Sequence, residues 1–349
     1  MLDFSEISVI VQGAITKDYT PKCLSSIRSN MPGAEIILSV AEGSDCSKLD
    51  YDKLILTQDP GAFLIDKKNN VYNNVNRQIV STVAGLKSTS RQYALKFRTD
   101  LELKSAEWLQ YFKRYDGVSA ATKFENRVLV CNYYTRNPRV FPVPYHLSDW
   151  IMFGNRNDLL KYFDVKLLDE TEALWFKHNP KKSLCFEHML SRYVPEQYFC
   201  INFLKQFDAI SCETYYDNNI KNIEGTERFF AENTIILDYQ TQLAIEFKKY
   251  NPNRYFDNPT LISYNDWRIL YNKYCKNNID HSWKLYLSKC MIKRIILFQW
   301  RRQIIAILSK LHLKEFFQHF LRNRKCFCKK EVIRKMDRSI KSIEEIHLR

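Results

Sequence analysis

Two carboxylates separated by one residue, Asp100 and Glu102, follow an apolar segment of the chain. Carboxylate oxygens are the ligands that Mg²⁺ and Mn²⁺ prefer, and such an ion can bridge a protein to a diphosphate. The same spacing is also common on exposed strands, where the side chains only face solvent. Because this pair directly follows an expected buried strand, we predict a metal site, with Asp100 as the stronger candidate and Glu102 as the weaker one.

Two cations, Lys96 and Arg98, precede these carboxylates. The planar guanidinium of Arg98 can hold phosphate oxygens through two N–H groups, whereas the ammonium group of Lys96 acts as a point charge. Either cation could instead form a structural ion pair with the neighbouring carboxylates. We expect Arg98 to contact a donor phosphate and keep the ion pair as the alternative.

The elements that must position these residues are visible in the hydrophobic pattern. In the first hundred residues short β-branched runs alternate with helix-like segments, which predicts an α/β fold with a mainly parallel sheet and flanking helices. Strands are expected over residues 7–11, 34–40, 53–57, 93–97, 128–134 and 149–153. Helices are expected over residues 22–29, 73–86, 158–163, 184–193 and 195–207.

Polar residues or glycines follow several of these strands. In an open α/β sheet, ligands bind beyond the carboxyl ends of the strands, so such residues should meet in one crevice. We therefore expect Gln12, Gly13 and Glu42 to surround a nucleotide, although ordinary loop composition is the alternative for any single turn. The chain contains neither the glycine pattern of dinucleotide-binding domains nor that of P-loop enzymes, which disfavours both classes.

A reaction in which a hydroxyl group attacks a carbon atom needs a carboxylate to accept the hydroxyl proton. Glu196 is the first candidate, because Pro195 suits the first turn of a helix and the positive end of the helix dipole favours an ionised carboxylate there. The alternative is that Glu196 only stabilises the helix. Asp149 is the second candidate.

Three further side chains could contact an acceptor. Trp150 offers a face on which a sugar can stack, although a Trp at the start of a strand more often belongs to the core. His146 and His188 could contact an acceptor or supply a further metal ligand, but a single histidine is more often structural. We assign His146 and Trp150 to the acceptor.

The positive charge is concentrated near the C-terminus. The chain has 53 Lys and Arg against 39 Asp and Glu, and residues 280–349 hold 18 of the former and 6 of the latter. A cation-flanked apolar stripe over 291–321 fits a helix on an anionic membrane surface, or alternatively one packed on a catalytic domain. We place a soft domain boundary near residue 245, with a basic and mainly helical region over 246–349.

Ten dispersed cysteines and no recognisable signal peptide predict a cytoplasmic protein.

Several motifs resemble those of a known family. They are V-Q-G at 11–13, A-E-I-I-L-S at 34–39, N-N-V-N-R-Q-I-V-S-T at 73–82, L-K-F-R-T-D at 95–100 and S-D-W at 148–150. On these motifs the chain resembles the WavE family of lipopolysaccharide-synthesis proteins. More broadly, it is similar to the nucleotide-sugar glycosyltransferases of the GT-A fold, in which Asp100-Leu101-Glu102 would occupy the D-x-D position.

The resemblance implies a GT-A-like catalytic domain over residues 1–245. It would transfer sugar from a nucleotide-sugar donor to a glycan or glycolipid acceptor of lipopolysaccharide, lipooligosaccharide or capsule, at the inner face of the membrane. It implies donor contacts from Gln12, Gly13, Glu42, Arg77, Arg98 and Asp100, and a divalent cation, Mn²⁺ or Mg²⁺, on Asp100 and Glu102. The sequence departs from the family pattern by reading D-x-E with Arg98 two residues before it, so a phosphate site made of cations alone is an alternative.

Two other functions remain open at this point. The basic tail could bind nucleic acid, which would make binding sensitive to salt. The chain could also be a catalytically inactive scaffold that binds glycans. Replacement of Asp100 by Asn would leave the scaffold intact but would impair a transferase.

Overall fold

The computed structural model describes residues 2–67, 70–115, 122–179, 189–207, 210–247 and 258–300. Internal contacts divide the chain into two units, residues 1–287 and 288–349. All elements that carry the candidate site belong to the first unit. Most of the amphipathic segment predicted over 291–321, and His188, lie outside the described residues.

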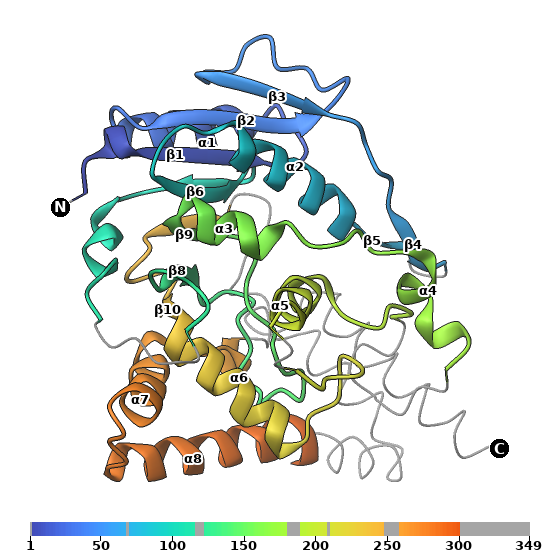
Figure 1. Ribbon diagram of the computed structural model, residues 1–349, viewed down its shortest axis with the longest axis vertical. Coiled ribbons are helices and arrows are strands. Elements are labelled where there is room, and N and C mark those ends of the chain that lie inside the picture. The colour runs from blue at the N-terminus through green and yellow to red at the C-terminus, as the bar shows by residue number, and fades with distance from the viewer. Residues whose placement is uncertain are drawn as a thin grey trace, which may run out of the picture. The chain divides into compact units, whose positions relative to one another are not determined.

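A seven-stranded mixed sheet forms the centre of the first unit (Figure 1), in the order β10-β8-β9-β6-β1-β2-β3. Its strands are β1 (Ile7–Gln12), β2 (Glu35–Ala41), β3 (Lys53–Thr57), β6 (Tyr93–Arg98), β8 (Val128–Cys131), β9 (Met152–Asn155) and β10 (Thr234–Leu237). Strand β9 is antiparallel to β6 and β8, and the other neighbouring pairs are parallel. The predicted α/β class with a mainly parallel sheet is therefore confirmed.

Two small antiparallel pairs accompany this sheet. One joins β7 (Leu101–Leu103) to β11 (Ile245–Phe247), and the other joins β4 (Phe63–Asp66) to β5 (Val71–Asn73). Because β11 pairs with β7, and the later helix α7 packs against β10, the boundary predicted near residue 245 falls inside the first unit.

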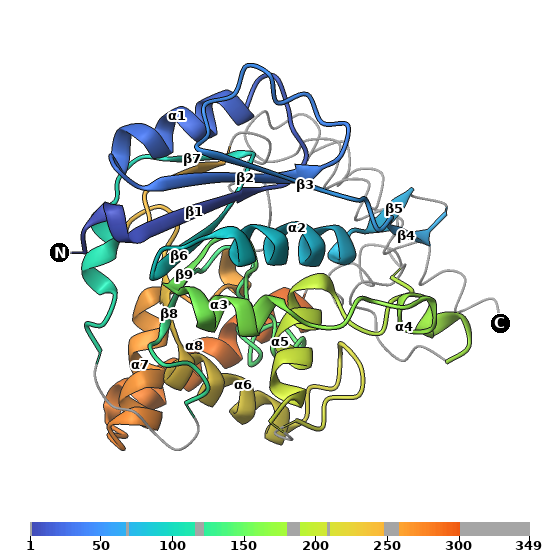
Figure 2. The same cartoon turned by 45° about the horizontal axis from the view of Figure 1, so that its top comes forward.

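Helices cover both faces of the sheet (Figure 2). Helix α1 (Thr20–Asn30) lies on one face, and α2 (Val75–Ser88) and α3 (Arg156–Phe163) lie on the other. The remaining helices are α4 (Glu170–Ala173), α5 (Pro195–Lys205), α6 (Ile220–Asn233), α7 (Tyr264–Cys275) and α8 (His281–Arg294). No helix within the described ranges is long and apolar enough to span a membrane.

The central strands read as continuous apolar runs because both of their faces are covered. All six residues of β1 are buried. Helix α2 approaches β1 so closely that a Cβ on Gly85 would lie 2.4 Å from Ile10 Cγ2. This close packing holds β1 in place, and the carboxyl end of β1 carries the first of the site residues.

Candidate active site

The carboxyl ends of β1 and β6 meet at the point where the sheet changes direction. The chain adds β2 and β3 on one side of β1 and then returns on the other side as β6, and ligands of open α/β sheets bind at such a switch point. The register pairs Gln12 with Arg98, and the Thr99 backbone N–H donates to the Gln12 carbonyl at 3.1 Å. Gly13 adopts φ +133°, and a Cβ there would lie 2.8 Å from Thr99 Oγ1, so this position requires glycine.

The first predicted metal ligand is held by an arginine. Arg98 donates through Nε to Asp100 Oδ1 at 2.9 Å and through Nη2 to Oδ2 at 2.8 Å. Glu102 instead pairs with Lys104 and, beside α1, lines a cavity of about 520 Å³ together with Ser26 and other residues of that helix. The two carboxylates therefore contact different elements.

This arrangement does not fit a divalent cation shared by Asp100 and Glu102. Both Asp100 oxygens accept hydrogen bonds from Arg98, and Lys104 neutralises Glu102. Within the described part of the chain, no group of three or more His, Cys, Asp or Glu side chains is placed to hold a metal ion. The divalent cation stays a prediction.

An aromatic stack supports Arg98. Its guanidinium carbon lies 4.0 Å from the ring centroid of Trp150, and Tyr134 stacks on Trp150 with centroids 5.6 Å apart and planes inclined by 9°. Arg136 covers the Tyr134 ring at 5.3 Å. The antiparallel register explains the first contact: Lys96 pairs with Met152, so two residues further on Arg98 falls opposite Trp150. The structure thus joins a predicted donor residue to a predicted acceptor residue.

Two carboxylates lie next to these cations: Asp149 is buried, and the Glu196 side chain is 13% exposed. Glu196 is the second residue of α5 and follows Pro195, as the sequence predicts. Burial, reinforced by the negative charge of Asp149, raises the pKa of Glu196 to about 8. Lys96 donates to the backbone carbonyl of Asp149, and burial lowers the pKa of Lys96 to about 8. At neutral pH Glu196 therefore mostly holds a proton.

His146 faces Glu196 as a neutral ring. Burial, with a smaller effect of the Arg136 charge, lowers the pKa of His146 to about 3. Its Nδ1 lies 2.8 Å from the Tyr134 carbonyl, which assigns the ring proton to Nδ1 as a donor. Nε2 is left as an acceptor, 3.8 Å from Glu196 Oε2. That separation is too long for a direct hydrogen bond, but a hydroxyl oxygen can bridge it.

The segment 132–151, which joins β8 to β9, carries most of these side chains. It is long, lacks helices and strands of its own, and is largely buried. Tyr134 and Tyr145 have φ +65° and +56°, values that are rare for bulky residues and that occur preferentially at functional sites. The Tyr145 N–H donates to Thr226 Oγ1 at 3.0 Å, and a Cβ on Gly225 would lie 2.3 Å from the Tyr145 hydroxyl. Helix α6 therefore holds this segment in its strained form.

Helix α5 is tied to the same segment through the residue after Glu196. Gln197 is fully buried, and its Nε2 donates to the carbonyls of Pro144 at 2.5 Å and Tyr215 at 3.1 Å. Glu196 and the backbone next to His146 are thus positioned by a single helix turn.

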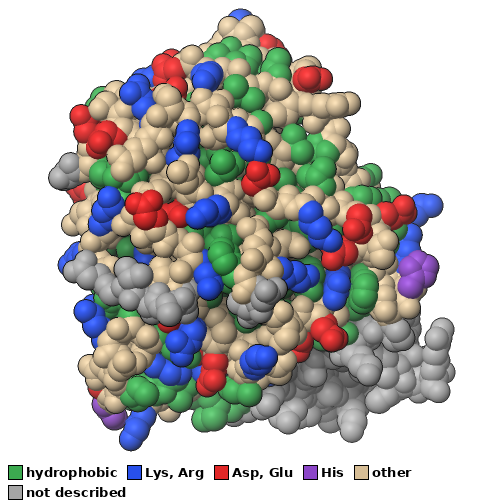
Figure 3. Space-filling model, in the orientation of Figure 1, with side chains coloured by type: hydrophobic (Ala, Val, Ile, Leu, Met, Phe, Trp, Pro, Cys, Tyr) green, Lys and Arg blue, Asp and Glu red, His purple; other side chains and the backbone are tan. Residues whose placement is uncertain are grey.

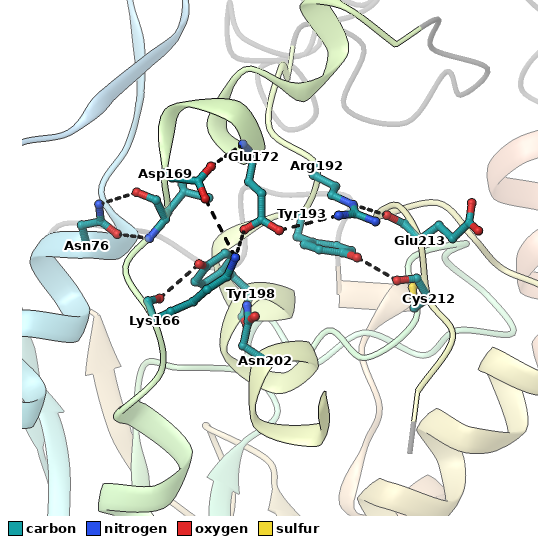
Figure 4. A network of polar contacts seen from close by, with 11 residues as sticks. Asn76, Lys166, Asp169, Glu172, Arg192, Tyr193, Tyr198, Asn202, Cys212 and Glu213 are labelled. Carbon is teal, nitrogen blue, oxygen red and sulfur yellow. Dashed lines mark hydrogen bonds and ion pairs between the residues drawn. The ribbon is translucent and has the colours of Figure 1, made fainter. Parts of the chain in front are cut away.

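A polar network on another side of α5 anchors the helix further (Figure 4). The Glu172 carboxylate lies 3.3 Å from Lys166 Nζ and 3.7 Å from Arg192 Nη1, and Tyr198 of α5 donates to the Lys166 carbonyl at 3.1 Å. Asn76 of α2 bonds both backbone groups of Leu168, so α2 joins the network. These contacts fix the helix that carries Glu196 to the elements around it.

The remaining predicted donor residues lie towards the β2 side of the edge. Arg77 is exposed and donates to Asp59 through Nε at 2.8 Å and Nη2 at 2.7 Å. One turn further along α2, Ser81 donates to Gln12 Oε1 at 3.2 Å, which links this helix to the switch point. Glu42 is exposed in the turn after β2.

Sequence reasoning missed two members of the site, Tyr134 and Arg136. Their only signal is an aromatic-rich run that precedes an arginine, which is also typical of core packing. A stronger signal was available for Lys96, a cation inside an otherwise apolar strand.

Comparison with known proteins gives one family assignment. A comparison with curated proteins finds no match. A family model described as WavE lipopolysaccharide synthesis matches residues 7–311, which cover most of the chain and all of the site residues. This confirms the resemblance seen in the sequence motifs, and the chain belongs to the WavE lipopolysaccharide synthesis family.

Proposed function

We propose that the protein is a glycosyltransferase that moves a sugar from a nucleotide-sugar donor to a growing surface glycan. Membership of the WavE family indicates a role in lipopolysaccharide biosynthesis. Polysaccharides of this kind grow by successive sugar transfers, so a transferase is the enzyme class that this role needs most directly.

One observation carries the proposal: the cation Arg98, the buried Asp149 and the largely buried Glu196 lie together at the edge of the sheet where ligands bind. Arg98 suits a leaving phosphate, and Glu196 and Asp149 suit an attacking hydroxyl. The parallel strands and the switch point between β1 and β6 support the GT-A-like assignment, with the nucleotide beside Gln12 and Gly13.

The side chains fit the roles of an inverting transfer. The acceptor hydroxyl oxygen forms the new bond to the anomeric carbon, the bond from that carbon to the donor phosphate oxygen breaks, and its electron pair leaves with the phosphate. Ionised Glu196 accepts the hydroxyl proton, and the raised pKa of Glu196 makes this carboxylate a strong base. Arg98 stabilises the negative charge that develops on the leaving phosphate. His146 Nε2 can orient the hydroxyl in the 3.8 Å gap to Glu196.

The proposal includes the acceptor and the place of reaction. The acceptor is a glycan or glycolipid of lipopolysaccharide, lipooligosaccharide or capsule, and the reaction takes place at the cytoplasmic face of the membrane. The concentration of Lys and Arg over residues 280–349 supports attraction to an anionic lipid surface. On the face of the molecule seen in Figure 3, by contrast, Lys and Arg are interspersed with Asp and Glu.

A donor screen tests the proposal. The full chain is mixed with UDP-, GDP-, CMP- and dTDP-sugars, with and without Mn²⁺, and its thermal unfolding and the release of free nucleotide are measured. We expect one donor class to stabilise the protein, by about 2.7 kcal/mol at a hundredfold excess over its dissociation constant. Nucleotide release should then depend on added acceptor. Failure of every donor to bind or to react would contradict the proposal, and salt-sensitive DNA or RNA binding in its place would favour a nucleic-acid role.

A further inference from the structure

We infer that Arg98 binds the donor phosphate directly and without a divalent cation, while Asp100 holds the guanidinium in place until phosphate replaces the carboxylate. This inference rests on the proposed transferase function and names how its donor site recognises phosphate. It differs from the metal site that the D-x-E motif predicts.

The first support comes from the two acidic side chains. Both Asp100 oxygens are engaged by Arg98 in a two-point interaction, and Asp100 retains only 8% side-chain exposure. Glu102 contacts Lys104 and lines a cavity beside α1 to which neither Arg98 nor Asp100 contributes. A shared metal ion would require both carboxylates to leave their cations and to come together.

The second support is the geometry of Arg98. Trp150 holds the guanidinium plane from one side at 4.0 Å, and the Arg98 side chain is 23% exposed, more than its Asp100 partner. The two N–H groups that now hold Asp100 have the spacing that suits two phosphate oxygens. Phosphate can therefore take the place of the carboxylate without disturbing the stack on Trp150.

The third support is the charge around the stack. Three cations surround the site: Arg98, Arg136 and Lys96. The charges of Arg98 and Arg136 act to lower the pKa of Glu196, and the charge of Glu196 acts to raise the pKa of Lys96. Of the three facing carboxyl groups, Asp100 is paired with Arg98, Asp149 lies beside Lys96, and burial raises the pKa of Glu196 to about 8. The site thus already contains the positive charge that a metal ion would supply to a phosphate.

The experiment measures phosphate binding apart from turnover. Inorganic pyrophosphate, UDP, GDP, CDP and dTDP are titrated by calorimetry into the full chain, once with EDTA and once with Mn²⁺. The same titrations are made with Arg98→Lys and Asp100→Asn, whose folding is checked by thermal unfolding. Arg28→Lys is the matched control, because Arg28 also binds carboxylates, Asp50 and Asp52, but on the outer side of α1.

We expect affinity for at least one diphosphate to be equal in EDTA and in Mn²⁺. Arg98→Lys should weaken it about tenfold or more, because lysine cannot make the two-point contact. Asp100→Asn should leave binding unchanged or strengthen it, because the competing carboxylate charge is gone. If Asp100 were a metal ligand, Asp100→Asn would instead weaken diphosphate binding.

Two results would overturn the inference in distinguishable ways. Binding that appears only with Mn²⁺ and is lost in Asp100→Asn would establish a metal-dependent donor site and leave the transferase proposal standing. Absence of diphosphate binding under both conditions would reject the inference and the proposed function together. The comparison of EDTA with Mn²⁺ on the unaltered chain decides the question even if a variant fails to fold.

Discussion

The sheet half formed by β1, β2 and β3 and the segment 132–151 are both buried, but they bury different chemistry. Val9 and Ile37 in the strands are fully buried and apolar. In the segment, Arg136, His146 and Asp149 are 2–3% exposed and polar or charged. Buried charges reduce stability unless they are paired and hydrogen-bonded, whereas buried apolar side chains stabilise the fold directly.

The difference teaches where stability and function lie. The buried apolar side chains of the strands provide the stability that an α/β scaffold requires, and the chemistry proposed for this half is confined to Gln12, Gly13 and Glu42 at the strand ends. The segment combines buried ionisable groups with two tyrosines in left-handed conformations, at Tyr134 and Tyr145, and neither feature improves stability. We therefore regard the segment as the part that was shaped by chemistry, and the following experiments test that division.

The largest effect is expected from removing the base. Glu196→Gln keeps the shape of the side chain but cannot accept a proton, so turnover should fall by about 10²- to 10⁴-fold. Thermal stability should stay the same or rise, since a buried ionisable group is gone. Initial rates and thermal unfolding measure both quantities. Glu170→Gln, in the exposed first turn of α4, is the control and should change neither.

Two glycine substitutions compare the regions directly. Gly85→Ala would press a methyl group against Ile10 in the strand half, which should reduce the free energy of unfolding by about 1–3 kcal/mol with the rate per folded molecule unchanged. Gly225→Ala would displace Tyr145. It should therefore lower the rate per folded molecule, while the free energy of unfolding changes less than in Gly85→Ala. Urea unfolding and initial rates separate the two. Equal patterns in both variants would show that the two regions are not functionally distinct.

A smaller effect is expected in the pH dependence of stability. Glu196 has a pKa of about 8 in the folded chain against 4.5 for the unperturbed group, so the folded state binds the proton more tightly. The contribution of Glu196 to the free energy of unfolding should therefore decrease as the pH rises from about 4.5 to about 8. His146, with a pKa of about 3, acts in the opposite sense below 6.5, and Lys96 acts only above about 8.

The contribution of Glu196 is isolated by comparing the unaltered chain with Glu196→Gln. Urea unfolding is measured for both across this pH range. The difference between them should vary with pH, and parallel curves would contradict a raised pKa. Activity should change the other way and increase towards the pKa of about 8, since the base acts in its ionised form.

The smallest effect is expected on the exposed surface of the strand half. Arg28→Lys weakens contacts with Asp50 and Asp52, whose side chains are 65% and 44% exposed. Solvent screens such pairs, so the free energy of unfolding should change by less than about 1 kcal/mol. A larger change in thermal unfolding would show that this surface network contributes to the scaffold.

The sequence predicts the scaffold better than the site. Strands β1, β2, β3 and β6 were expected because they are short, mostly apolar runs, a pattern that depends on local composition alone. The D-x-E pair was expected directly after a buried strand, with both carboxylates pointing into one metal site. In the structure Thr99 and Asp100 form a turn between β6 and β7, so the alternation of a strand does not continue across them.

The rest of the site depends on contacts between distant residues. The strand expected over 128–134 ends at Cys131, and Tyr134 has a left-handed conformation that a strand cannot contain. The strand expected from residue 149 begins at Met152, which leaves Asp149 and Trp150 in the segment before it. The contact between Trp150 and Arg98 follows from the antiparallel pairing of β6 with β9. The local sequence of neither strand predicts that pairing.

The reversed direction of β9 has a consequence for how such a protein can diversify. Because β8 and β9 are adjacent and antiparallel, segment 132–151 is in effect an enlarged hairpin loop whose two ends are fixed side by side. The entropy of closing such a loop grows only slowly with its length. Insertions and deletions there are compatible with an unaltered strand register, so this segment can vary in length while the sheet on both sides of it stays the same.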